Sequence, residues 1–219
     1  MAVPIYSKGE FLMKKRLHDK KAGIAILAVL FIISLAEVVL RSVILKEAMF
    51  NLSNAGEPII TAAFSLMLII FALKGKDRVF HILCGVWLGY FVMNQLYNLP
   101  GLIADTVERY NAGSFNTAIC NSIHTLSMIC IVVIGALLVE YMNDGSIYNK
   151  TFNILCAITV VMLLLLALHS GVYDALVLGR TEVILASLHN LSRMAMVFLF
   201  TFFAYDSAKA QLKKTNLTK

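Results

Sequence analysis

Charged side chains are scarce in this sequence. Only 15% of its 219 residues are Asp, Glu, Lys or Arg, whereas 59% are apolar. A water-soluble domain of this length could not cover so many apolar side chains with so few polar ones. The composition therefore indicates that a lipid bilayer is the solvent for most of the chain.

Short motifs of several enzyme classes are also absent. The sequence contains no P-loop, no GxSxG and no HExxH, and its four cysteines show no CxxC spacing. Cys84, Cys120, Cys130 and Cys156 all lie in apolar stretches, which favours buried free thiols. The first twenty residues are too charged for a secretory signal peptide, so we expect an uncleaved first helix.

The sequence does contain six apolar stretches long enough to cross a bilayer as helices. They cover residues 22–45, 58–73, 79–99, 117–141, 152–178 and 181–205. We therefore predict an all-α integral membrane protein with a six-helix transmembrane bundle at 22–205. A basic N-terminal segment at 1–21 precedes it, and a short tail at 206–219 follows. Pro100 is predicted to end the third helix, and residues 103–110 are expected to form a separate interfacial helix.

Lys and Arg are distributed unevenly between the connecting segments. Fourteen lie in the N-terminal segment, the second connection, the connection at Lys150 and the tail, whereas the opposite connections carry only Lys46, Arg109 and Arg180. The positive-inside rule then predicts that both termini are cytoplasmic in a plasma membrane. We therefore attribute the net charge of +6 mainly to membrane topology and to contacts with lipid headgroups. We expect no nucleic-acid partner.

Two pairs of short segments repeat. Residues 122–127 read SIHTLS and residues 187–192 read SLHNLS, while residues 80–84 read FHILC and residues 152–156 read FNILC. These matches predict that the second and third two-helix hairpins are copies of one unit. The first two helices form a diverged third hairpin, and parallel repeats of this kind tend to place a site at the interface between them.

Ionisable side chains inside a bilayer are costly and are candidates for function. At 1.5 Å per residue, the three intramembrane histidines are predicted to share one depth in the outer half of the bilayer. The side chains that we predict to line a ligand site there are His124, His189, His169, Glu37, Arg41, Arg193, Asn121 and Asp174. Glu37 and Arg41 at i and i+4 could instead form a structural ion pair, and intramembrane amides commonly join helices.

These residues favour binding over catalysis. We expect a cavity that takes a small polar solute or a cation, in transport or sensing, with a partner membrane or cytoplasmic subunit. The alternative is an intramembrane metal-dependent enzyme such as a hydrolase, with zinc held by His124, His169 and His189. A further alternative is a haem b held between His124 and His189, although no second histidine pair lies near the inner face. A purely structural subunit also remains open.

Overall fold

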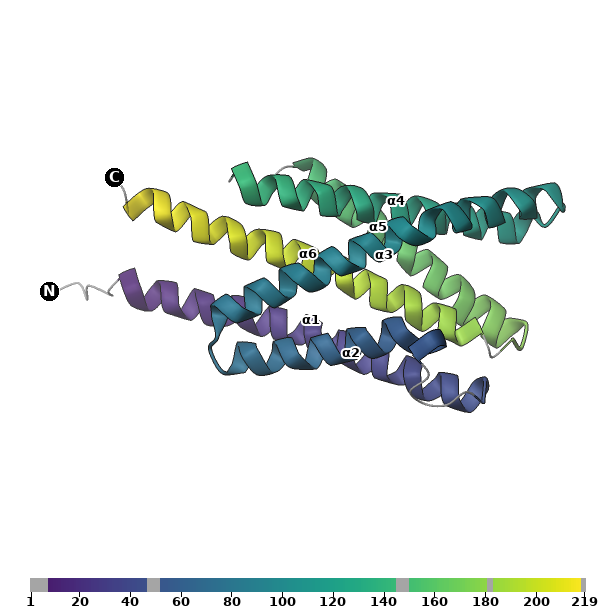
Figure 1. Ribbon diagram of the computed structural model, residues 1–219, viewed down its shortest axis with the longest axis horizontal. Helices are drawn as coiled ribbons and strands as arrows, with labels where there is room; N and C mark the ends of the chain where they lie inside the picture. Colours follow the sequence, from purple (N-terminus) through teal and green to yellow (C-terminus); the bar gives the residue numbers. More distant parts are fainter. Residues whose placement is uncertain (1–7, 47–51, 145–149, 181–182, 218–219) are drawn as a thin grey trace, which may run out of the picture.

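The computed structural model describes residues 8–46, 52–144, 150–180 and 183–217 (Figure 1). Its helices are α1 Lys8–Ile44, α2 Leu52–Leu73, α3 Asp77–Asn111, α4 Phe115–Asp144, α5 Lys150–Leu168, the π-helix η1 His169–Val177 and α6 Ile184–Leu217. No β-strand occurs in the described ranges. The first seven residues of the predicted basic segment and the last two of the predicted tail lie outside them.

Six stretches of these helices are long and apolar enough to cross a membrane. They are Lys21–Ile44, Gly56–Leu73, Arg78–Asn111, Phe115–Leu138, Thr151–Val177 and Ile184–Phe202. Within lipid, a helix satisfies its own backbone hydrogen bonds, so each stretch can span without exposing unpaired polar groups. The prediction of an all-α protein with six candidate membrane-spanning helices is confirmed.

The predicted end of the third helix is wrong. α3 continues through Pro100 to Asn111, so residues 103–110 form its last turns and no separate interfacial helix. A proline inside a helix removes the hydrogen bond that its own nitrogen would have donated, here to the carbonyl of Leu96, and its ring crowds that carbonyl. The bonds of the neighbouring turns remain, and membrane helices tolerate such a loss.

Successive helices run in opposite directions, so that the start of α1 and the end of α6 lie at the same end of the bundle (Figure 1). We call the opposite end the distal end. α6 is the central helix, because it contacts α1, α4, α5 and η1. Half of the residues in its apolar stretch are buried, a larger share than in any other stretch.

The apolar core fills the half of the bundle nearer the termini. Trp87 stacks on Phe64 with ring centroids 5.9 Å apart, and Phe91 packs on Phe200 at 6.2 Å. Gly23 lets α1 approach α6 closely, since a Cβ at that position would lie 2.6 Å from the ring of Phe202. Close packing of this kind is the main force that holds helices together in lipid.

α5 continues directly into η1, a nine-residue π-helix. Its i→i+5 pattern shows in the hydrogen bond from the Leu178 nitrogen to the Tyr173 carbonyl at 3.0 Å. Gly171 in this segment lies against α6, and the Ser187 hydroxyl donates to the Ala167 carbonyl at 2.8 Å. The wider helix changes which side chains share a face, and such segments are frequent at functional sites.

Candidate functional site

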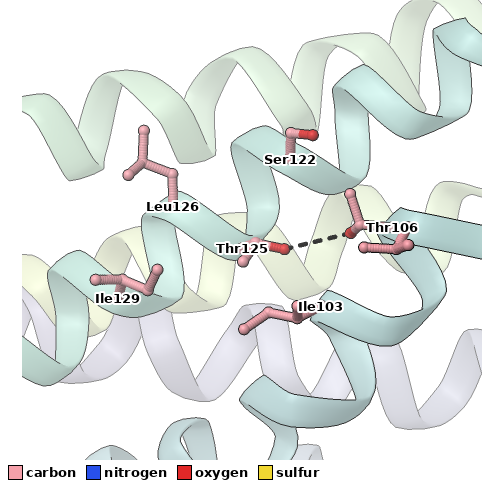
Figure 2. Close-up of a pocket in the computed structure, with 7 residues that line it drawn as sticks. Ile103, Thr106, Ser122, Thr125, Leu126 and Ile129 are labelled. Carbon is pink, nitrogen blue, oxygen red and sulfur yellow. Dashed lines mark hydrogen bonds between the residues drawn. The ribbon is translucent and has the colours of Figure 1, made fainter. Parts of the chain in front are cut away.

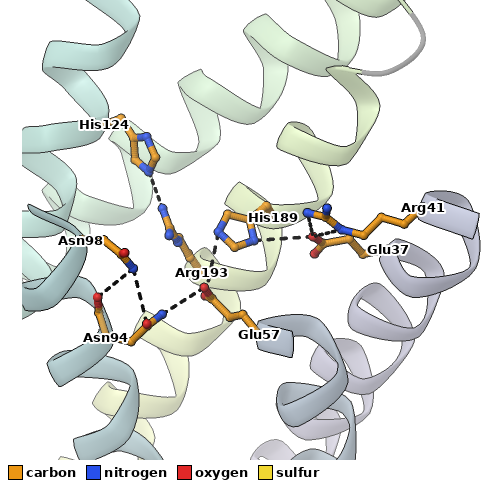
Figure 3. Close-up of polar contacts among 8 residues, drawn as sticks. All are labelled: Glu37, Arg41, Glu57, Asn94, Asn98, His124, His189 and Arg193. Atoms are coloured by element: carbon orange, nitrogen blue, oxygen red, sulfur yellow. Dashed lines mark hydrogen bonds and ion pairs between the residues drawn. The ribbon is translucent and has the colours of Figure 1, made fainter. Parts of the chain in front are cut away.

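A layer of polar side chains crosses the bundle near its distal end (Figure 3). We call it the charged layer, and its members are Glu37, Arg41, Glu57, Asn94, Asn98, His124, His189 and Arg193. They come from five helices: α1, α2, α3, α4 and α6. At 1.5 Å per residue, Glu37, Glu57 and His189 lie about 8–11 Å from the distal ends of their helices.

Glu37 of α1 is almost completely buried, with 1% of its side chain exposed. Arg41, one turn later, donates to its Oε1 from Nη2 at 3.0 Å and from Nε at 3.3 Å. A carboxylate in this position needs a counter-ion, because an unpaired buried charge is strongly disfavoured. The predicted i, i+4 ion pair is therefore present, and Glu37 has a second neighbour in His189.

His189 of α6 lies between two carboxylates on different helices. Its Nδ1 is 3.7 Å from Glu37 Oε1, and its Nε2 is 3.9 Å from Glu57 Oε1 (Figure 3). Both separations are longer than a direct hydrogen bond. The imidazole thus separates two like charges, one on α1 and one on α2, and faces each of them with a ring nitrogen.

α3 extends the layer to the surface of the bundle. Asn94 donates from Nδ2 to Glu57 Oε2 at 3.1 Å. Asn98, which is exposed, donates to the Asn94 carbonyl at 2.9 Å. Glu57, Asn94 and Asn98 were not among the predicted site residues. Their sequence signal was a single carboxylate near the start of the second apolar stretch and two amides at i and i+4.

Arg193 of α6 points toward His124 of α4, and its Nη1 contacts His124 Nε2 (Figure 3). A guanidinium carries only donors, so Nε2 of His124 is the acceptor and this imidazole is the neutral tautomer with its proton on Nδ1. Arg193 is 4% exposed, and its Nε has no hydrogen-bond partner among the described residues. His124 therefore faces a cation, whereas His189 faces anions.

Further buried polar atoms lack a partner within the described part of the chain. They are both amide atoms of Gln95, Oδ1 of Asn190 and Oγ of Ser34. Gln95 is completely buried and lies one turn beyond Phe91 on the same face of α3. Such groups cost free energy when they stay unpaired. The interior near the distal end thus has donor and acceptor capacity that its own side chains do not use.

The structure divides the eight predicted site residues into three groups. Glu37, Arg41, His124, His189 and Arg193 meet in the charged layer. His169 and Asp174 lie together in η1, and Asn121 lies on α4 against α3. No contact among the described residues joins them to the charged layer.

In η1, His169 Nδ1 lies 3.2 Å from Asp174 Oδ2, and the ring of Tyr173 packs on His169 at 5.4 Å. Residues at i and i+5 point in different directions on an α-helix, and it is the π-helix that brings this pair together. Between α3 and α4, Asn121 donates to Asp105 Oδ2 at 2.6 Å, and Arg109 donates to the same oxygen at 2.9 Å. These side chains form local pairs.

A three-histidine metal site does not fit this geometry. His124 faces Arg193, His169 faces Asp174, and His189 has its two carboxylates on opposite sides of the ring. Within the described residues, no group of three or more His, Cys, Asp or Glu side chains is placed to hold a metal ion. The haem hypothesis fits no better, because Nε2 of His124 and both nitrogens of His189 are turned toward other side chains. The four cysteines are free.

A groove of about 370 Å³ lies between α3 and α4, away from the charged layer (Figure 2). Its lining residues are Ile103, Thr106, Val107, Ser122, Thr125, Leu126 and Ile129. The Thr106 and Thr125 hydroxyls lie 3.5 Å apart, and the other walls are mostly apolar. None of the predicted site residues lines this groove, so it is not the polar cavity that the sequence led us to expect.

Comparison with known proteins adds no identification. No family model, no curated protein and no solved structure matches the chain. The functional argument therefore rests on the side chains of the charged layer and on the chemistry that they support.

Proposed function

We propose that this protein is a multi-pass plasma-membrane protein that binds a small polar solute in the charged layer and acts in its transport or sensing. The supporting observation is that polar atoms inside the bundle lack hydrogen-bond partners, although an unpaired polar atom in such a place is energetically unfavourable. Two carboxylates and two guanidiniums lie within a membrane bundle, and Glu37 and Arg193 are almost completely buried. Buried atoms of Arg193 and Gln95 lack hydrogen-bond partners among the described residues. If these side chains only joined helices, the bundle would be most stable with all of their donors and acceptors paired with one another.

The proposed orientation places the charged layer in the outer half of the membrane. The described basic residues gather toward the end of the bundle that carries both termini, which the positive-inside rule assigns to the cytoplasm. The layer lies near the distal end, where a solute would arrive from outside. We further propose that the second and third hairpins are repeats of one unit and that a partner subunit supplies energy coupling or signal output.

The competing hypothesis is that the layer only holds the helices together. It connects α1, α2, α3, α4 and α6, and breaking it would weaken the bundle under either hypothesis. The two differ in what happens when a solute is added to the intact protein. A solute that binds the folded form stabilises it by about 2.7 kcal/mol at a hundred times its dissociation constant.

The test uses the full chain in lipid nanodiscs and follows its thermal unfolding with a panel of solutes. The panel contains alkali and alkaline-earth cations, ammonium compounds, small carboxylates, amino acids, amides and sugars. We expect at least one solute to raise Tm in a saturable way in the wild type and in the control His169→Gln. The same solute should have at least tenfold lower affinity for His189→Gln and Glu57→Gln.

Two results would contradict the proposal. One is that no solute class stabilises the wild type while His189→Gln and Glu57→Gln lower its Tm, which would support the helix-joining hypothesis. The other is that an active solute stabilises all variants equally, which would place its site outside the charged layer. His169→Gln is a matched control because His169 lies in the separate pair with Asp174.

A further inference from the structure

We infer that the solute of the charged layer is a small zwitterion, with its carboxylate on Arg193 and its ammonium group on Glu57. This inference rests on the proposed function and names the chemical class of ligand. It comes from counting which charges in the layer already have a partner of opposite charge and which do not.

One ion pair in the layer is closed. Arg41 holds Glu37 through two nitrogens, Nη2 at 3.0 Å and Nε at 3.3 Å. The carboxylate of Glu37 also has Nδ1 of His189 at 3.7 Å on another side. Glu37 and Arg41 already neutralise each other, so neither of them is a strong candidate to bind a charged group of the solute.

The remaining two charges are Arg193 and Glu57, and they do not contact each other directly. Arg193 has the His124 imidazole at Nη1, and its Nε has no partner among the residues that the structure describes. Glu57 accepts from the neutral Asn94 amide at Oε2, and its Oε1 has only the long contact of 3.9 Å to His189. The layer therefore contains one incompletely paired cation and one incompletely paired anion, from α6 and α2.

A zwitterion suits this arrangement better than a simple ion does. The two carboxylates and the two guanidiniums of the layer sum to zero, and a zwitterion leaves that sum unchanged. A lone anion or cation would add a net charge to a buried site, which is costly in a low-dielectric interior. The guanidinium fork of Arg193 matches a carboxylate, and its burial at 4% exposure removes competing water.

The experiment compares ligands that carry both charges with ligands that carry one. Thermal unfolding of the full chain in nanodiscs is followed with glycine, β-alanine and γ-aminobutyrate, which differ only in the spacing of their charges. Acetate, methylammonium and an equimolar mixture of the two serve as single-charge probes at the same ionic strength. We expect at least one amino acid to bind tenfold or more tightly than acetate, methylammonium or their mixture.

The variants Arg193→Gln and Glu57→Gln should each weaken that binding at least tenfold. Their matched controls are Arg109→Gln and Glu108→Gln, which remove the same charges on α3 outside the layer and should leave the affinity within twofold. Arg193→Lys retains the charge without the fork and should bind three- to tenfold more weakly than the wild type. This variant keeps the test decisive if Arg193→Gln does not fold.

The inference is overturned if single-charge probes bind as tightly as the amino acids, or if amino-acid binding survives both substitutions. The measurements distinguish an error in the class of solute from an error in the proposed function. A sugar, a metal cation or a simple anion that stabilises the wild type but not His189→Gln would leave the solute site standing and remove the zwitterion. Absence of any stabilising solute would remove both.

Discussion

Two six-residue segments of this protein share four residues and place their histidines in opposite electrical surroundings. Residues 122–127 of α4 read SIHTLS and residues 187–192 of α6 read SLHNLS. His124 accepts from a guanidinium and is neutral, whereas His189 lies between two carboxylates. The shared motif fixes where each imidazole sits along its helix. The side chains that neighbouring helices bring to it decide what it does.

The position that follows each segment explains much of the contrast. It is Met128 in α4 and Arg193 in α6. Met128 is a buried packing residue, whereas Arg193 is a buried cation that reaches across to the histidine of the other segment. One copy of the motif thus supplies the donor for the other copy. A substitution at this position that makes the segments more alike should remove the cation that faces His124.

Arg193→Met gives α6 the residue that α4 has at this position, and we expect the largest effect from it. It removes the donor to His124 and leaves Glu57 with less positive charge nearby. Losing a hydrogen bond made by a charged group costs up to about 3 kcal/mol. Unfolding with dodecyl sulfate in mixed micelles would measure this loss. The control Arg109→Met alters an exposed ion pair and should cost less than about 1 kcal/mol. Equal costs for both variants would contradict a central place for Arg193.

Substituting the two histidines by alanine should lower the free energy of unfolding by different amounts. His189→Ala leaves two carboxylates facing each other without a group between them, and we expect a loss of about 2–3 kcal/mol. His124→Ala removes one acceptor from Arg193 and should cost about 1–2 kcal/mol. The same unfolding titration measures both. Adding Glu57→Gln to His189→Ala should cost less than the sum of the single effects, because one carboxylate no longer carries a charge. Strict additivity would show that Glu57 and His189 do not interact.

The sequence was sufficient for those features that depend on one helix at a time. The presence of six apolar stretches, the Glu37–Arg41 pair at i and i+4, and the free cysteines all follow from local spacing and composition. The same reasoning selected five of the eight members of the charged layer. Each of the five is an ionisable side chain inside an apolar stretch, and such a side chain is conspicuous whatever surrounds it.

Features that depend on helix rotation or on irregular backbone were not predictable in this way. Asn94 belongs to the layer because α3 turns it toward Glu57 of α2, and no spacing within α3 encodes that contact. His169 was expected at the common site, but the π-helix pairs it with Asp174 instead. Pro100 was expected to end a helix that in fact continues. In each case tertiary contacts or a small local rearrangement overrode the local rule.

The smallest expected difference concerns the serines that open the two segments. The Ser187 hydroxyl donates to the Ala167 carbonyl of α5 at 2.8 Å, whereas the Ser122 hydroxyl donates to the Ala118 carbonyl of its own helix at 2.8 Å. Ser187→Ala should therefore cost about 0.6 kcal/mol, the usual size of a hydrogen bond between membrane helices. Ser122→Ala should cost nearly nothing, because its bond joins no second helix and alanine is the better helix former. Repeated unfolding titrations of the two variants side by side would resolve the difference. If Ser122→Ala cost as much as Ser187→Ala, the two serines would contribute alike, and the contrast between the segments would begin only at their histidines.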